Sequence, residues 1–199
     1  MLTDSSKVLL FRFLVFCIGV APGIIFVWWW VSGGLGANPA EAAVHFTGKT
    51  GLVLLLITIA FSPTFRLTGW RGVMMARRQM GLWAFFWLVA HMLTWFGWEQ
   101  YWEWQWIWHD IWALHYVRYG VLALLLLVPL AITSLQWFPQ QMGWKAWHWL
   151  HRLIYVSAGL GVYHLWELTR ADYLVPLGFA IAFAVLVVFR LIDALIHRQ

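Results

Sequence analysis

The sequence contains few charged residues. Only 11% of its 199 residues are charged, whereas 63% are apolar, and the mean hydropathy is +0.73. A water-soluble globular chain carries about 25% charged residues. This scarcity of charge excludes a soluble enzyme, a nucleic-acid-binding protein and a disordered protein, despite a net charge of +5. The composition therefore predicts an integral membrane protein.

Cysteine is almost absent as well. Cys17 is the single cysteine, which excludes an intrachain disulfide, a zinc finger and an iron–sulfur cluster held by thiolates. It lies in an apolar run, which favours a buried, unreactive thiol. No Gly-rich phosphate-binding loop follows a strand pattern, so we expect no nucleotide-binding domain in this chain.

Long apolar runs take up most of the chain. A bilayer core about 30 Å thick is crossed by a helix of roughly 20 apolar residues. The runs are continuous rather than alternating, which favours helices over a membrane barrel. We predict an all-α, single-domain membrane bundle over residues 1–199. Its six transmembrane helices are expected at about 9–31, 50–65, 80–97, 118–137, 147–167 and 173–195.

The first apolar run is predicted to be a retained span. Lys7 and Arg12 resemble the basic start of a signal peptide. However, the run is about twenty residues long, ends in Trp28-Trp29-Trp30 and has no clean small-residue cleavage site after it. The three tryptophans are typical of an interfacial anchor.

The basic residues are distributed unevenly between the two sides of the predicted bundle. Ten of the 13 Lys and Arg residues fall on the side of the N-terminus, in the two termini and around residues 66–78 and 145–152. Six of the eight acidic residues fall on the other side. The positive-inside rule therefore predicts that both termini are cytoplasmic.

Three connecting segments have distinct compositions. Residues 32–49 are predicted to form a Gly-rich turn and a short amphipathic helix on the outer face, and residues 66–79 a basic cytoplasmic loop. Residues 95–116 contain seven tryptophans beside acids and histidines. This composition is typical of an interfacial belt in the outer headgroup layer, and a partner-docking surface is the alternative.

Three histidines lie inside predicted spans. His91 is in the third, and His151 and His164 are in the fifth. Ionisable groups within a membrane generally pair, line a pathway or bind a cofactor. Two neutral imidazoles can supply both axial ligands of a haem iron without adding charge. Hydrogen bonding between helices and a proton or metal pathway are the alternatives.

Helical geometry alone does not pair these histidines. His91 is expected about midway in depth between His151 and His164. Thirteen residues at roughly 100° each place the latter two about 220° apart on a straight helix. They share one face only if that helix is bent or overwound. The sequence therefore allows one haem with two histidine ligands, and a second only with an unusual or shared ligand.

Several motifs in order along the chain resemble one known family. They are Gly33-Gly-Leu-Gly-Ala-Asn-Pro39, His45-Phe-Thr-Gly48, Arg77-Arg-Gln-Met-Gly-Leu-Trp83, Trp147-His-Trp-Leu-His151-Arg-Leu-Ile-Tyr155 and His164-Leu-Trp166. Together they resemble the MsrQ family of haem-binding membrane subunits, which belongs to the ferric-reductase-like transmembrane family. The resemblance covers nearly the whole chain.

The resemblance implies a function in electron transfer. It implies a haem b subunit of the bacterial inner membrane that takes electrons from the quinone pool or a cytoplasmic flavin reductase. It further implies FMN as a cofactor. Electrons would pass to MsrP, a periplasmic molybdenum-dependent methionine sulfoxide reductase that repairs oxidised periplasmic proteins. The family's haem-linked histidines correspond to His91, His151 and His164. On this reading the chain is an electron-transfer subunit and not the catalytic one.

The chain departs from relatives with two haems, in which the third and fifth spans each supply two histidines. Fourteen residues before His91 is Arg77, and fourteen after it is Gln105. A second conventional bis-histidine haem is therefore not expected.

The cytoplasmic side carries a group of basic residues that could hold a flavin phosphate or lie beside a quinone. They are Arg77, Arg78, Lys145 and Arg152. Basic residues on this side are also what topology alone requires. Two other functional classes stay open, namely another ferric-reductase-like cytochrome b carrier and a histidine-lined proton or metal transporter.

Overall fold

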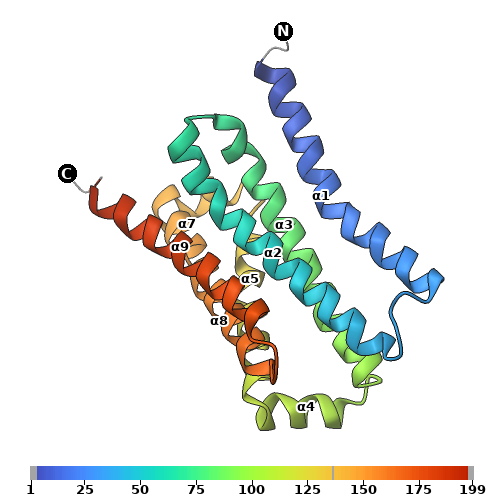
Figure 1. Ribbon diagram of the computed structural model, residues 1–199. Helices are drawn as coiled ribbons and strands as arrows, with labels where there is room; N and C mark the ends of the chain where they lie inside the picture. Colours follow the sequence, from blue (N-terminus) through green and yellow to red (C-terminus); the bar gives the residue numbers. More distant parts are fainter. Residues whose placement is uncertain (1–3, 136, 197–199) are drawn as a thin grey trace. The chain divides into compact units, whose positions relative to one another are not determined.

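The computed structural model describes residues 4–135 and 137–196 (Figure 1). Within these ranges the chain is all-helical, as predicted, with nine α-helices, one π-helix and no strand. It divides into two compact units, Met1–His109 and Asp110–Gln199, which we describe separately as unit 1 and unit 2.

The elements of unit 1 are α1 (Asp4–Ser32), α2 (Pro39–Thr68), α3 (Arg71–Thr94) and the π-helix η1 (Trp95–Glu99). Helix α4 (Trp104–Ala113) leads from unit 1 into unit 2. The elements of unit 2 are α5 (His115–Ile132), α6 (Phe138–Met142), α7 (Trp144–His151), α8 (Leu153–Leu168) and α9 (Leu174–Ile196).

Five helical stretches among the described residues are long and apolar enough to cross a membrane. They are Asp4–Ser32, Pro39–Thr68, Arg71–Glu99, His115–Ile132 and Leu174–Ile196. They correspond in order to the first, second, third, fourth and sixth predicted spans. The span expected at 147–167 is not among them, so the six-span architecture stays a prediction.

The 147–167 segment is divided into two helices. Helix α7 ends at His151, where the N–H of Arg152 donates to the carbonyl of Trp149 over 3.1 Å, a tightened last turn. Helix α8 then has 16 residues, which at roughly 1.5 Å per residue is about 24 Å and shorter than a bilayer core. The segment predicted as one span is therefore interrupted at Arg152.

Helix α2 begins earlier than predicted. The side chain of Asn38 accepts a hydrogen bond from the N–H of Glu41 at 3.3 Å, and Pro39 occupies the first turn. Both features favour a helix start. The separate short amphipathic helix expected within 32–49 is instead the first part of α2, continuous with the second span.

The basic segment 66–79 is mostly helical rather than a loop. Gly69 closes α2 in a left-handed conformation (φ 68°), and its N–H donates to the carbonyl of Phe65 over 2.8 Å. Glycine adopts this conformation without steric cost. Because α3 starts at Arg71, only residues 69–70 separate the two helices.

In unit 1, α2 and α3 run side by side and antiparallel, and α1 lies along α3 (Figure 1). Gly51 on α2 faces Leu88, where a Cβ would lie 2.7 Å from the leucine side chain. Gly19 on α1 lies under the ring of Trp83, and its carbonyl accepts a hydrogen bond from Nε1 of Trp87 at 2.9 Å. Small residues at these contacts let the helices approach closely, as is typical of membrane helix packing.

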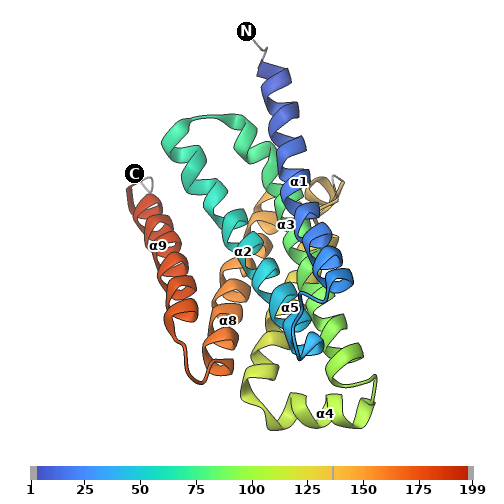
Figure 2. The same cartoon turned by 45° about the vertical axis from the view of Figure 1, so that its right-hand side comes forward.

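In unit 2, α8 packs between α5 and α9, and Figure 2 shows α8 and α9 running antiparallel. The buried hydroxyl of Ser157 on α8 donates to the carbonyl of Ala123 on α5 over 2.8 Å. Gly159 faces the ring of Phe183 on α9. Nε1 of Trp147 on α7 donates to the carbonyl of Thr133 over 2.9 Å, which ties α7 to the end of α5.

Large apolar side chains are exposed along α1 and α9. Examples are Leu9, Val31, Leu174 and Leu195, each more than two-thirds exposed. Apolar exposure on this scale marks a surface covered by lipid or protein, and lipid fits helices of this length.

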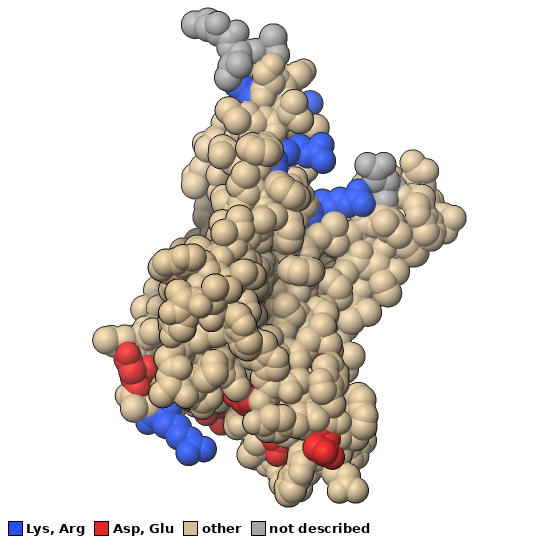
Figure 3. All heavy atoms as spheres, turned by 90° about the vertical axis from the view of Figure 1, so that its right-hand side faces the viewer, with Lys and Arg blue, Asp and Glu red and all other residues tan. Residues whose placement is uncertain are grey.

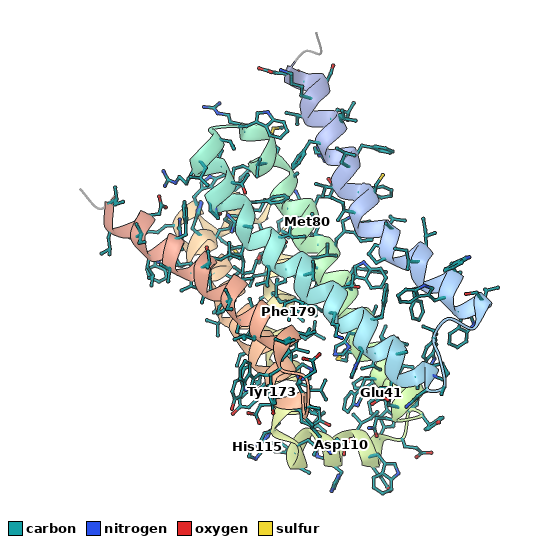
Figure 4. The ribbon with its side chains drawn as sticks, viewed as in Figure 1. Glu41, Met80, Asp110, His115, Tyr173 and Phe179 are labelled. Atoms are coloured by element: carbon teal, nitrogen blue, oxygen red, sulfur yellow. The ribbon has the colours of Figure 1, made fainter. Side chains whose placement is uncertain are left out.

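Charge separates along the helices of unit 1. Gln79 on α3 donates to the carbonyl of Arg12 on α1, so the basic start of α1 lies beside the basic start of α3. Glu41 lies at the other end of the pair, at the start of α2 (Figure 4). Figure 3 shows basic atoms near the beginning of the chain, and elsewhere on the same face it shows basic atoms close to acidic ones. Which end of unit 1 faces the cytoplasm stays a prediction of the positive-inside rule.

We expect reporter fusions to identify which segments face the cytoplasm. Fusions in residues 66–79 and after the C-terminus, which lies outside the described residues, should report cytoplasm, and fusions in 98–116 should report periplasm. The reason is the ten-to-three distribution of basic residues between the two sides. A periplasmic C-terminus would mean that α7 and α8 do not cross the membrane.

Candidate functional site

His91 lies on α3 and is bound to the neighbouring helix α2. Its Nδ1 lies 2.9 Å from the carbonyl oxygen of Val44. A carbonyl can only accept, so Nδ1 carries a proton; in the neutral imidazole the lone pair is then on Nε2. The ring is half-buried and lies against Gly48, where a Cβ would come within 2.9 Å of both Cε1 and Nδ1.

Two threonines surround this contact. Oγ1 of the buried Thr47 lies 2.8 Å from the carbonyl of Ala43 and 3.1 Å from that of Val44. It also lies 3.3 Å from Oγ1 of Thr94, which donates to the carbonyl of His91 itself over 2.8 Å. The side chain and the backbone of His91 are thus both included in one hydrogen-bonded network between α2 and α3.

His164 lies on α8 and is bound to α5 in the same way. Its Nδ1 lies 2.6 Å from the carbonyl oxygen of Tyr116, so Nδ1 carries a proton here as well. Gly120 lies beneath the ring, where a Cβ would lie 3.0 Å from Nδ1 and 3.1 Å from Cε1.

His151 is held differently. Its Nδ1 lies 3.0 Å from the carbonyl of Trp147 on its own helix, and its ring stacks on the Trp147 indole with 3.8 Å between centroids. His148, one turn earlier, makes the same contact with the carbonyl of Trp144 and is exposed. His151 therefore lies at the end of α7, beside the interruption, rather than on a continuous span with His164.

The four basic residues predicted to hold a flavin or a quinone fall into two groups. Arg77 and Arg78 lie in the first half of α3 in unit 1. Lys145 lies on α7, and Arg152 follows it with its guanidinium 4.1 Å from the Trp149 ring centroid, a cation–π contact. A common site for all four stays a prediction.

Comparison with known proteins shows the family. The model of the ferric reductase like transmembrane component family matches residues 47–162. A protein-methionine-sulfoxide reductase heme-binding subunit MsrQ from Rhodospirillum rubrum is 40% identical over 188 residues, covering 94% of this chain and 90% of that relative. The chain belongs to the MsrQ family. Further MsrQ relatives come from Herminiimonas arsenicoxydans, with 36% identity over 78% of the chain and 72% of the relative, and from Azospira oryzae, with 35% over 90% and 77%.

Membership of the MsrQ family confirms the resemblance inferred from the sequence motifs. The name of these relatives describes a haem-binding subunit. This agrees with the expectation that histidines in the predicted spans bind a haem. The matched region 47–162 includes His91 and His151 and ends two residues before His164.

Sequence reasoning missed the residues that hold the histidines. Neither Gly48, which ends one of the family motifs, nor Gly120 was assigned a role from the sequence. No sequence signal marks the carbonyls of Val44 and Tyr116, because every residue has a main-chain carbonyl. A glycine in an apolar helix is a weak signal that another group approaches closely.

Proposed function

We propose that this chain is the haem b-containing electron-transfer subunit of a methionine sulfoxide reductase system. The proposal depends on one observation, which is that His91 and His164 are held in the same way. Each is a half-buried imidazole whose Nδ1 is bound to a backbone carbonyl on a neighbouring helix.

The donor set fits a haem iron. Histidines that bind metals almost always donate their other ring N–H to a carbonyl, carboxylate or water, which fixes the tautomer and the ring orientation. His91 and His164 meet this condition with carbonyls of α2 and α5. Neutral nitrogen ligands also suit a site within a membrane, where added charge is costly.

The roles of the residues follow from this chemistry. His91 and His164 would hold the main haem through Nε2, and His151 would be a histidine of the cytoplasmic half. When bound, the haem supplies reversible one-electron transfer at iron. The hydrogen bonds to Val44 and Tyr116 would orient the ligands and raise their basicity, and the surrounding apolar side chains would exclude water.

Electrons would enter from the cytoplasmic side. The donor is the quinone pool or a cytoplasmic flavin reductase, and FMN would be bound at the basic cytoplasmic rim. Arg77 and Arg78 on α3 and Lys145 and Arg152 around α7 supply positive charge there, which suits a flavin phosphate.

Electrons would leave on the periplasmic side of the bacterial inner membrane. The acceptor would be MsrP, the molybdenum-dependent methionine sulfoxide reductase, which acts on oxidised periplasmic proteins. The acids predicted on this side support an outer docking face, since three basic and six acidic residues give it a formal charge of −3.

An optical spectrum of the purified protein tests this proposal. We expect a Soret band and, on reduction, an α band typical of b-type haem, followed by reoxidation when MsrP and a methionine sulfoxide are both present. Haem bands without electron delivery to MsrP would indicate a different ferric-reductase-like carrier. Absence of haem, with histidine-dependent proton or metal flux in vesicles, would indicate a transporter.

A further inference from the structure

His91 and His164 are held at the same register in the two units. In unit 1 the carbonyl that binds the imidazole belongs to Val44, and the glycine beneath the ring follows four residues later at 48. In unit 2 the corresponding residues are Tyr116 and Gly120, again four residues apart. The chain separations between carbonyl and histidine are also nearly equal, at 47 and 48 residues. In this arrangement, a carbonyl and a glycine one turn apart face a histidine on an antiparallel helix. We call it the histidine cradle.

The glycine is what allows the ring to reach the carbonyl. A Cβ at position 48 would lie 2.9 Å from Cε1 and Nδ1 of His91, and one at position 120 would lie 3.0 Å from Nδ1 of His164. Ordinary van der Waals contact begins at 3.4 Å, so an alanine at either position would displace the ring. The carbonyl lies on the same helix one turn away, so a displaced ring would have a longer and weaker hydrogen bond.

Other glycines at helix contacts face apolar side chains instead. Gly81 in unit 1 faces the methyl group of Thr58, and Gly159 in unit 2 faces the ring of Phe183, each with a Cβ distance of 3.3 Å. His151 has no such cradle, since its Nδ1 is bound within its own helix.

We propose that Gly48 and Gly120 are positioning residues for the two iron ligands. Each admits an imidazole close enough for its Nδ1–H to donate to a main-chain carbonyl, which sets the direction of the Nε2 lone pair and raises the basicity of the ligand. The inference rests on the proposed function, because it takes His91 and His164 as the ligands of the haem.

The two cradles differ in one hydroxyl. Oγ1 of Thr47 lies 3.1 Å from the Val44 carbonyl and shares its single proton between this carbonyl and the nearer one of Ala43 at 2.8 Å. Even a shared donor weakens the bond that the Val44 carbonyl makes with His91. The corresponding position in unit 2 is Tyr119, whose ring contacts Tyr163. Removing the Thr47 hydroxyl should therefore strengthen the His91 hydrogen bond, make that imidazole more basic and stabilise the ferric haem.

The test uses the purified full-length protein with haem bound. Gly48→Ala and Gly120→Ala should each lower haem affinity, by at most the roughly 10–100-fold that follows complete loss of the outer partner of a ligating histidine. The haem that remains should show an altered low-spin electron paramagnetic resonance signal and a higher midpoint potential. Gly81→Ala and Gly159→Ala are the matched controls, expected to keep the wild-type signal and potential.

A second variant tests the hydrogen bond between His91 and the Val44 carbonyl if the glycine variants do not fold. Thr47→Val adds no group near the His91 ring and should lower the midpoint potential, opposite in sign to the glycine variants. General damage to packing would not produce shifts of opposite sign. An unchanged or higher potential in Thr47→Val would overturn the hydrogen-bond link on which the cradle depends.

The outcomes separate this inference from the proposed function. Full haem retention in His91→Ala and His164→Ala would overturn the ligand assignment itself. Loss of haem in those variants, with Gly48→Ala and Gly120→Ala indistinguishable from their controls in haem content, signal and potential, would overturn the cradle alone.

Discussion

His91→Ala and His164→Ala are each expected to abolish most haem binding. Loss of an outer partner of a metal-bound histidine already costs about 10–100-fold in affinity, and loss of the ligand itself should cost more. Both imidazoles present Nε2 from a ring oriented by a carbonyl of another helix. The measurement is the haem-to-protein ratio of the purified variants, with helix content by circular dichroism as the check on folding.

His151→Ala is the matched control for these variants. We expect it to retain more haem, because His151 is bound to its own helix at the carbonyl of Trp147 and stacks on that indole. Equal loss of haem in His151→Ala, with full retention in His164→Ala, would move the main haem to the cytoplasmic half of the bundle.

Reversing three outer acids is expected to slow electron transfer to MsrP. Glu99 ends the π-helix η1, Glu103 precedes α4, and Asp110 lies within α4 (Figure 4). The triple change to lysine turns the formal charge of the outer side from negative to positive. Charge acts mainly on the rate of encounter, and steering changes association rates by about 10–10³-fold. We expect a loss on the order of tenfold at low salt, measured as the rate of haem reoxidation by MsrP.

Neutral replacements give the graded control for the charge effect. Glu99→Gln, Glu103→Gln and Asp110→Asn together should give an intermediate rate, and added salt should reduce the difference between all three proteins. The haem spectrum should not change, since none of these residues is a proposed ligand. A triple lysine variant that reduces MsrP at the wild-type rate at every ionic strength would exclude this segment as the docking surface.

The tryptophans of this segment also bear on docking. Trp104, Trp106, Trp108 and Trp112 are each more than three-fifths exposed on α4, whereas Ile107 is buried. Such a helix suits the headgroup layer of the membrane, and it also suits a partner, because aromatic side chains are enriched at interface hot spots. The charge-reversal test addresses the docking role alone.

The sequence by itself determined the class of the protein and most of its helices. Continuous apolar runs can satisfy their backbone groups in lipid only as helices, so the stretches now seen as α1, α3, α5 and α9 could be located from hydropathy. The family could also be inferred, because several motifs occur in order at specific spacings. His91 and His164 could be singled out, since an ionisable residue in an apolar run requires a reason.

Local chain geometry set two helix ends that hydropathy could not locate. Hydropathy averages over a window, so it does not register a single turn. The chain therefore reverses at Gly69 where a 14-residue loop was expected, and the predicted helix at 147–167 is interrupted at Arg152.

Only the tertiary structure decided how the histidines are held. A main-chain carbonyl is the same group in every residue, so nothing in the sequence marks Val44 or Tyr116 as the acceptor for an imidazole nearly 50 residues away. Gly48 and Gly120 acquire a role only once packing brings a ring within 3.1 Å of the place where a side chain would begin. These contacts depend on which helices pack together and at what register, and that choice depends on the summed packing of whole helix surfaces rather than on any single residue.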